Sequence, residues 1–181
     1  MRVYSGRVIT LDVETVTFPD GSTGELEIIR HPGAAAVVPL LSDPAGPDPT
    51  ILMLRQYRYA TGGTLWEVPA GTLGADEAPA ACARRELEEE AGVRAGRLES
   101  LTTIWTTPGF TTETIHLFWA ADLTATRAAP ERDEFIEVVP RPLSEVLDDI
   151  RRGEIRDAKS VVALLYLAGF VLAGGNSRGE V

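Results

Sequence analysis

Four glutamates, Glu86, Glu88, Glu89 and Glu90, lie within five consecutive residues of a segment expected to be helical. Successive residues of an α-helix are rotated by about 100°, so Glu90 falls about 40° and Glu89 about 60° from Glu86. Glu88 falls near 200°, on the opposite side. Three carboxylates on one face suit a hard divalent cation such as Mg²⁺, which prefers oxygen ligands and is often completed by substrate phosphates. The spacing alone predicts either a metal site or a solvated acidic face.

The residues that flank these glutamates favour the metal site. The segment from Gly71 to Val93 matches the pattern G-x5-E-x7-R-E-U-x-E-E-x-G-U, where U is aliphatic, at all nine specified positions. The matching residues are Gly71, Glu77, Arg85, Glu86, Leu87, Glu89, Glu90, Gly92 and Val93. This segment resembles the Nudix box, and a chance match at so many positions is improbable.

The resemblance implies a fold, a reaction and a set of metal ligands. The fold is an α/β/α sandwich around a mixed sheet, and the reaction is hydrolysis of a nucleoside diphosphate linked to a further group. Glu86 and Glu90 would bind the metal directly, and Glu89 would be a ligand or would contact a metal-bound water. The carbonyl of Ala70 would complete the coordination of Mg²⁺, for which Mn²⁺ could substitute.

Three further box residues have supporting roles by the same resemblance. Arg85 would orient the carboxylates, as suits a guanidinium held beside a glutamate. Glu77 would lie behind the ligands, and Gly71 would allow the turn between loop and helix. A bound cation would neutralise the charge that shields a pyrophosphate from attack and would lower the pKa of a bound water.

Outside the box, three stretches resemble the ADP-ribose pyrophosphatase branch of the family. They are "RQYR" at 55–58 before "WEVPAG" at 66–71, "TPGFTTE" at 107–113, and "GEIRDAKS" at 153–160. Arg55 and Arg58 are expected to bind phosphate, because arginine can bind it bidentately. Alternatively, they are surface residues at the end of a strand and have no role in binding. Trp66 is either a core residue or a substrate contact, and Glu67 is either solvated or in contact with substrate or metal-bound water.

The segment 107–113 is the candidate for a loop that closes over the substrate. Pro108 lies sixteen positions after Gly92, as in that branch, and Gly109 follows it. We expect Glu113 to be the general base, since such loops often complete hydrolase sites. Glu89 is the competing base, and a solvated Glu113 is the structural alternative.

The N-terminal segment departs from that branch near Glu27. An arginine often precedes this glutamate in the branch, whereas Glu25 and Leu26 occupy those positions here. By resemblance, the N-terminal strands are exchanged across a homodimer and the adenine lies near the subunit boundary. Glu27 is therefore a candidate substrate contact, and recognition is expected to differ from that of the typical enzyme.

The two histidines and the single cysteine are expected to have structural roles. Cys82 shares the face of Glu86, but a thiol is a poor ligand for Mg²⁺, so we expect it to pack as a small apolar residue. His31 and His116 have no partners at metal-ligand spacing.

The elements that must position these residues give an α+β or mixed α/β class. We expect a box helix with Asp76 as N-cap, Pro79 in its first turn and Gly92 after its end. Further helices are expected over 143–153 and 159–173. Strands are expected over 3–18, 25–31, 34–41, 51–59, 65–71, 101–107, 113–123 and 134–142. Residues 1–32 are assigned to an N-terminal β region, 33–175 to the Nudix domain, and 176–181 to a flexible tail.

Composition excludes some partners. The 181 residues have a formal net charge of −10, so no basic field attracts nucleic acid or an anionic membrane. The longest apolar run, from Val161, has about 13 strongly apolar residues, short of the ~20 needed to span a bilayer. The single cysteine and the lack of an apolar leader favour the cytoplasm.

The sequence thus predicts metal-dependent hydrolysis of ADP-ribose to AMP and ribose 5-phosphate. Two alternatives remain open. One is a pyrophosphatase acting on a nucleotide sugar or another ADP derivative, and the other is a non-catalytic module that senses ADP-ribose.

Overall fold

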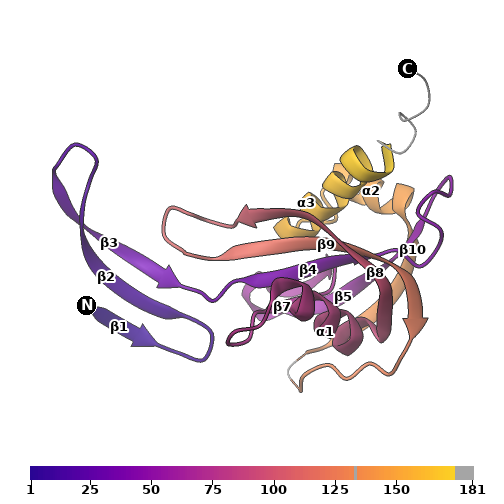
Figure 1. Ribbon diagram of the computed structural model, residues 1–181, viewed down its shortest axis with the longest axis horizontal. Helices are drawn as coiled ribbons and strands as arrows, with labels where there is room; N and C mark the ends of the chain where they lie inside the picture. The colour runs from indigo at the N-terminus through magenta and orange to yellow at the C-terminus, as the bar shows by residue number, and fades with distance from the viewer. Residues whose placement is uncertain (133, 174–181) are drawn as a thin grey trace.

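The computed structural model describes residues 1–132 and 134–173 (Figure 1). Its strands are β1 (Arg2–Ser5), β2 (Thr10–Thr17), β3 (Thr23–Arg30), β4 (Ala34–Pro39), β5 (Thr50–Arg58), β6 (Gly63–Glu67), β7 (Ala70–Thr72), β8 (Val93–Trp105), β9 (Thr114–Ala125) and β10 (Ile136–Pro142). Its helices are α1 (Pro79–Ala91), α2 (Leu143–Arg152) and α3 (Ala158–Tyr166), with a short 3-10 turn, η1 (Tyr59–Thr61), and a π-helical turn, η2 (Leu167–Leu172).

Strand β4 lies at the centre of the molecule, as its continuous apolar run predicts. All six of its residues are buried. It runs parallel to β9 and antiparallel to β7 in a four-stranded sheet of order β7-β4-β9-β8, and the sheet is therefore mixed. Strand β5 forms a second, antiparallel sheet of order β10-β5-β6.

Alternate residues of β4 face two different cores. Ala35 and Val37 pack with the buried residues of α1, whereas Ala36 and Val38 pack with those of α2 and α3. This alternation follows from the two-residue period of a strand. Figure 1 shows α1 on one side of the sheets and α2 with α3 on the other. The predicted α+β class, with a mixed sheet between helical layers, is confirmed.

The N-terminal strands form a separate sheet of order β1-β2-β3 that extends away from the rest of the molecule (Figure 1). The hairpin of β2 and β3 is confirmed, but the expected strand over 3–18 is two strands, separated by a turn closed by the Gly6 amide donating to the Ile9 carbonyl. Near the end of β3, the Ile29 amide donates to the Phe110 carbonyl, and the Thr112 amide donates to the Ile29 carbonyl. This sheet is thereby joined to the loop between β8 and β9.

The start of α1 differs from the prediction. Ala78, not Asp76, is the N-cap, and the helix begins at Pro79. The residue before a proline is disfavoured in the helical region, and Ala78 is extended, with ψ 140°. Asp76 lies in the preceding turn with φ 59°. Gly92 ends the helix in the left-handed conformation, as predicted.

Several other boundaries also differ. Strand β8 is longer than expected, because it begins directly after Gly92, and the last expected helix is divided into α3 and η2. No helix within the described ranges is long and apolar enough to cross a membrane. The predicted tail at 176–181 lies outside the described residues.

Candidate active site

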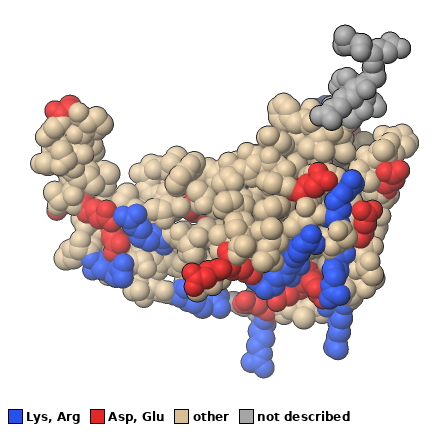
Figure 2. Space-filling view, viewed as in Figure 1, with Lys and Arg blue, Asp and Glu red and all other residues tan. Residues whose placement is uncertain are grey.

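A cavity of about 1090 Å³ brings the box together with residues from several other segments. Residues of the box line one part of the cavity, and two further predicted site residues, Arg58 and Glu113, line other parts of it. The predicted residues in its lining are Arg58, Ala70, Gly71, Glu77, Arg85, Glu86, Glu89 and Glu113. Figure 2 shows acidic and basic side chains mixed over the region of α1 on the face in view. The cavity thus combines carboxylates with a smaller number of cations.

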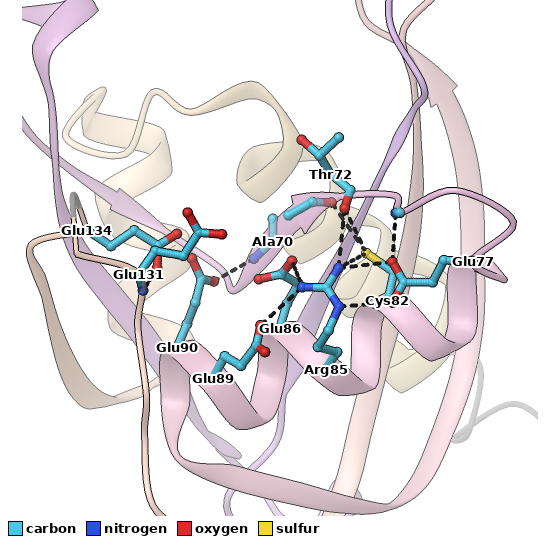
Figure 3. A network of polar contacts seen from close by, with 12 residues as sticks. Ala70, Thr72, Glu77, Cys82, Arg85, Glu86, Glu89, Glu90, Glu131 and Glu134 are labelled. Atoms are coloured by element: carbon cyan, nitrogen blue, oxygen red, sulfur yellow. Dashed lines mark hydrogen bonds and ion pairs between the residues drawn. The ribbon is translucent and has the colours of Figure 1, made fainter. Parts of the chain in front are cut away.

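The glutamates of α1 divide as helical geometry predicts. Glu86 and Glu90 lie on the buried face, with 7% and 2% of their surfaces exposed, while Glu89 is more open. Leu87 turns into the core. Glu88 lies away from the site and pairs with Arg94 at 2.7 Å. Figure 3 shows Glu86, Glu89 and Glu90 on the same side of the helix, toward Ala70 at the start of β7.

Arg85 links the carboxylates of the box. Its guanidinium donates to Glu77 at 2.9 Å, to Glu86 at 2.5 Å and to Glu89 at 3.0 Å (Figure 3). It also donates to the Thr72 carbonyl at 3.2 Å. The hydrogen bond from Arg85, with a second from the Gly74 amide, lowers the pKa of Glu77 to about 2. Glu77 is therefore a permanent anion that holds Arg85 in place.

The Glu86 carboxylate closely approaches the backbone of Gly71. A β-carbon on Gly71 would lie 1.8 Å from Oε1 of Glu86 and 2.1 Å from its Cδ. Its φ is not in the left-handed region, so conformational freedom is not the reason for a glycine here. A side chain at this position of β7 would displace the Glu86 carboxylate from its place.

Glu90 has one carboxylate oxygen that is satisfied and one that is not. Its Oε2 accepts a hydrogen bond from the Ala70 amide at 2.8 Å, while Oε1 is buried without a hydrogen-bond partner among the described residues. Burial raises the pKa of Glu90 to about 8, and it also raises the pKa of Glu86. Both shifts arise chiefly because carboxylates are held out of water, a situation that a bound cation would compensate.

The donor set fits a hard divalent cation. Buried carboxylates, one of them with a free oxygen, lie beside the loop backbone at Ala70. Within the described ranges, no three His, Cys, Asp or Glu side chains converge to enclose an ion by themselves. A magnesium-like ion retains waters and is usually completed by substrate phosphates, so it does not need a full set of protein ligands.

A second acidic segment, absent from our sequence predictions, lies opposite the box. Glu131 and Glu134, in the loop before β10, line the cavity and lie beside Glu90 (Figure 3). The negative charge of Glu134 contributes to the raised pKa values of Glu86 and Glu90. The acidic stretch "ERDE" at 131–134 was the available signal, but only Glu134 entered our sequence predictions, as the first residue of the strand expected over 134–142.

Glu67 is buried between two cations. It is 1% exposed, and Arg58 donates to both of its oxygens at 2.8 Å. Lys159 donates to it at 2.5 Å and to Asp157 at 3.0 Å. Burial alone would raise the pKa of Glu67, but the hydrogen bond from Arg58 and the charge of Lys159 outweigh it and lower the pKa. Arg58 and Lys159 both line the cavity. Glu67 is therefore not solvated.

Lys159 and Asp157 were not predicted as site residues, although "GEIRDAKS" was noted as a segment. Both residues are distant in sequence from the box, so no local pattern predicts that they lie near it. Only the packing of α3 beside β6 brings Lys159 to Glu67.

Glu113 lines the cavity from the segment just before β9. Its carboxylate accepts a hydrogen bond from the Thr106 hydroxyl at 2.9 Å and lies 3.6 Å from Nδ1 of His31. His31 Nδ1 itself accepts from the Gly33 amide at 3.0 Å, in the turn after β3. Glu113 is thus partly ordered by the junction with the N-terminal sheet.

The other predicted substrate contacts lie outside the cavity lining, as far as the described residues define it. Arg55 is exposed, 3.5 Å from Glu137. Trp66 packs on the core and beneath the Arg141 guanidinium, 5.1 Å from its ring centre. Glu27 is exposed on β3, and Pro108 and Gly109 lie in an exposed turn.

Cys82 and His116 have the structural surroundings that we expected. Cys82 is buried, with its thiol 3.5 Å from the Gly71 carbonyl, and burial raises its pKa to about 12. His116 pairs with the Thr103 hydroxyl across β8 and β9 at 3.0 Å.

Comparison with known proteins agrees with this architecture. A solved structure described as "Crystal structure of ADP compounds hydrolase" superposes with a TM-score of 0.80 over 99% of this chain and 94% of that one, at 22% identity. This likeness concerns the fold.

Two curated relatives cover most of the chain. The "Methanol dehydrogenase activator" of Bacillus methanolicus and the "ADP-ribose pyrophosphatase" of Bacillus subtilis (strain 168) are each 39% identical over 168 residues, 92% of this chain and 88% of the relative. A "GDP-mannose pyrophosphatase" of Cronobacter sakazakii (strain ATCC BAA-894) is 42% identical over 127 residues, 65% of this chain and 66% of the relative. The NUDIX domain model matches residues 31–164, and the chain therefore belongs to the Nudix family of hydrolases.

Proposed function

We propose that this Nudix hydrolase cleaves ADP-ribose to AMP and ribose 5-phosphate in a metal-dependent reaction. The observation that carries the proposal is the juxtaposition, in one cavity, of the box carboxylates with the cations Arg58 and Lys159. A diphosphate needs both positive side chains and a cation to enter so acidic a site. The relative named "ADP-ribose pyrophosphatase", which matches over 92% of this chain, supports the choice of substrate.

The metal would be held by Glu86, Glu90 and the Ala70 carbonyl, with Glu89 as a further ligand or as a contact to a metal-bound water. We propose Mg²⁺ as the ion, with Mn²⁺ as a substitute. When bound, it would neutralise phosphate charge and acidify a coordinated water. The buried, unpartnered oxygen of Glu90 supports this assignment.

The chain's own residues would orient the substrate. Arg58 is held by Glu67 through Nε and Nη2, and its remaining nitrogen, Nη1, is not used in that pair. Together with Lys159, it would bind the diphosphate, since both line the cavity. Arg85 would keep Glu86 and Glu89 in position and would not itself react.

A carboxylate must accept the proton of the attacking water. Glu113, our choice from the sequence, lines the cavity, as does its competitor Glu89. Glu134 is a third candidate, and its charge acts directly on Glu86 and Glu90. We propose that the base is one of these three, with Glu134 favoured by its position beside the box ligands.

We also propose a cytoplasmic homodimer formed through the N-terminal sheet. Val3, Tyr4, Phe18 and Leu26 of residues 1–32 are exposed, and a partner subunit would cover such apolar surface. In that arrangement Glu27, Arg55, Trp66, Pro108 and Gly109 would contact the substrate at the subunit boundary. Light scattering during gel filtration tests the assembly, and a monomer at micromolar concentration would contradict it.

Turnover of a substrate panel tests the function. ADP-ribose should have the highest kcat/KM in a panel that also includes GDP-mannose, UDP-glucose, NADH and diadenosine polyphosphates. Higher kcat/KM for a nucleotide sugar would instead favour the alternative that the relative in Cronobacter supports. Tight ADP-ribose binding without turnover of any substrate would identify a sensing module.

A further inference from the structure

The segment from Glu67 to Gly71 joins β6 to β7 and delivers the backbone of the proposed metal site. Because Ala70 must lie beside Glu90, and Gly71 over Glu86, small shifts of this segment would separate the groups that hold the cation. The position of the segment is therefore as important as the identity of the carboxylates.

Four consecutive residues of this segment are fixed by groups from elsewhere in the chain. Glu67 is held by Arg58 and Lys159, and the Val68 amide donates to the Ser160 hydroxyl at 2.8 Å. Farther along, the Pro69 carbonyl accepts from the Val37 amide at 2.9 Å, and the Ala70 amide donates to Glu90 at 2.8 Å.

Two of these contacts come from the first turn of α3. Ser160 is fully buried, and its hydroxyl donates to Asp157 at 2.6 Å while it accepts from Val68. Asp157 also receives the Ser160 amide and the Lys159 ammonium, both at 3.0 Å. One carboxylate thus orients both side chains that reach the segment.

We infer that the first turn of α3 positions the metal-binding segment, and that Ser160 is the positioning residue within it. Ser160 is not in the cavity lining that the described residues form, unlike Lys159, so its effect on the reaction is indirect: it acts on the backbone at Val68 and on the Asp157 carboxylate that holds Lys159. This gives the "GEIRDAKS" segment a role beyond substrate contact. The inference rests on the proposed metal site at Glu86, Glu90 and Ala70.

The test compares Ser160→Ala with Val146→Ala. Ser160→Ala removes the hydroxyl but keeps the helix cap, because the backbone amide of residue 160 still donates to Asp157. Val146→Ala, at a core-facing position of α2, is the control for a general loss of stability. Mn²⁺ binding to the substrate-free protein is measured by electron paramagnetic resonance, and hydrogen exchange is measured over residues 66–72.

Ser160→Ala should weaken Mn²⁺ binding on the order of tenfold, as is typical for residues that support metal ligands. It should also speed exchange of the Val68 and Ala70 amides and lower kcat more than it raises KM. Val146→Ala should change none of these. Ser160→Cys keeps nearly the same side-chain size but has only a weakly hydrogen-bonding thiol, so it should give the same result as Ser160→Ala. It serves as the test variant if Ser160→Ala does not fold.

Unchanged Mn²⁺ affinity in both Ser160 variants, or equal losses in Val146→Ala, would overturn the positioning role. A wild-type chain that binds no Mn²⁺ would overturn the metal assignment and this inference together. Failure of ADP-ribose as a substrate, with the Mn²⁺ effect present, would overturn only the substrate proposal.

Discussion

The Ala70 amide and the Glu90 carboxylate are joined by a 2.8 Å hydrogen bond that leaves the second oxygen of Glu90 buried and unpartnered among the described residues. The bond fixes the carboxylate against the loop. The unpartnered oxygen is the one that we propose to bind the metal.

Glu90→Gln should therefore abolish most turnover without unfolding the protein. The amide has nearly the same shape and can still accept from Ala70, but it lacks the charge that a cation requires. Mn²⁺ affinity should fall about 10- to 100-fold, and kcat/KM with it. Glu88→Gln, on the outer side of α1, is the matched control and should retain wild-type rates. Undiminished turnover in Glu90→Gln would refute the metal assignment.

Gly71→Ala should be as damaging as the loss of a ligand. The new methyl group would overlap the Glu86 carboxylate, and a displacement of about 1 Å can cost ~10²-fold in rate. Gly63→Ala serves as the control, because a β-carbon on Gly63 meets nothing within 4 Å. Steady-state kinetics with Mn²⁺ titration measures the effect. Equal activities of the two variants would show that Glu86 can move without loss.

The general base is identified by comparing Glu134→Gln, Glu113→Gln and Glu89→Gln. Loss of the base should lower kcat by about 10²–10⁴-fold with little change in KM. That variant should also lose the acidic limb of its pH–rate profile, because the carboxylate no longer has to ionise. A variant that changes only KM identifies a binding residue, and this outcome for Glu134 would return Glu113 to first place.

Asp149 should make the protein sensitive to acid. The hydrogen bond from Arg141, supported by Arg152, lowers the pKa of this carboxyl below its usual 3.8. Its contribution to stability is therefore complete above that value and is lost as the pH falls through the lower pKa of the folded state.

Asp149→Asn should accordingly reduce the free energy of unfolding at neutral pH, on the order of 1–3 kcal/mol, and by less in strong acid. Urea unfolding between pH 2 and pH 7 measures this, with Asp148→Asn, an exposed neighbour, as control. Coincident stability curves for wild type and Asp149→Asn would show that the pair contributes nothing, and curves with a constant offset would contradict the predicted dependence on pH.

Local sequence patterns predicted much of the fold. Residue types within a short segment are enough to predict the buried strand β4, the turn between β2 and β3, and the end of α1 at Gly92. The start of α1 was misplaced because Asp76 is a good capping residue by type, whereas the restriction that Pro79 places on Ala78 decided the boundary.

The site was only partly predictable, for a different reason. Glu86, Glu89 and Glu90 share a helix, so their relation is fixed by its period. Glu134 and Lys159 reach the same cavity only through the packing of distant segments, which no local pattern encodes. The reason for Gly71 was also hidden, because its close neighbour is a side chain fifteen residues away.

The contact between Ser160 and Val68 also bears on how the protein is made. A nascent chain that has emerged as far as Val93 already carries the whole box, yet the segment before it lacks its buried partner on α3. Synthesis proceeds from the N-terminus, and domains generally fold as units. Binding of the proposed metal should therefore be a late event in biogenesis, after α3 has formed and packed against this segment.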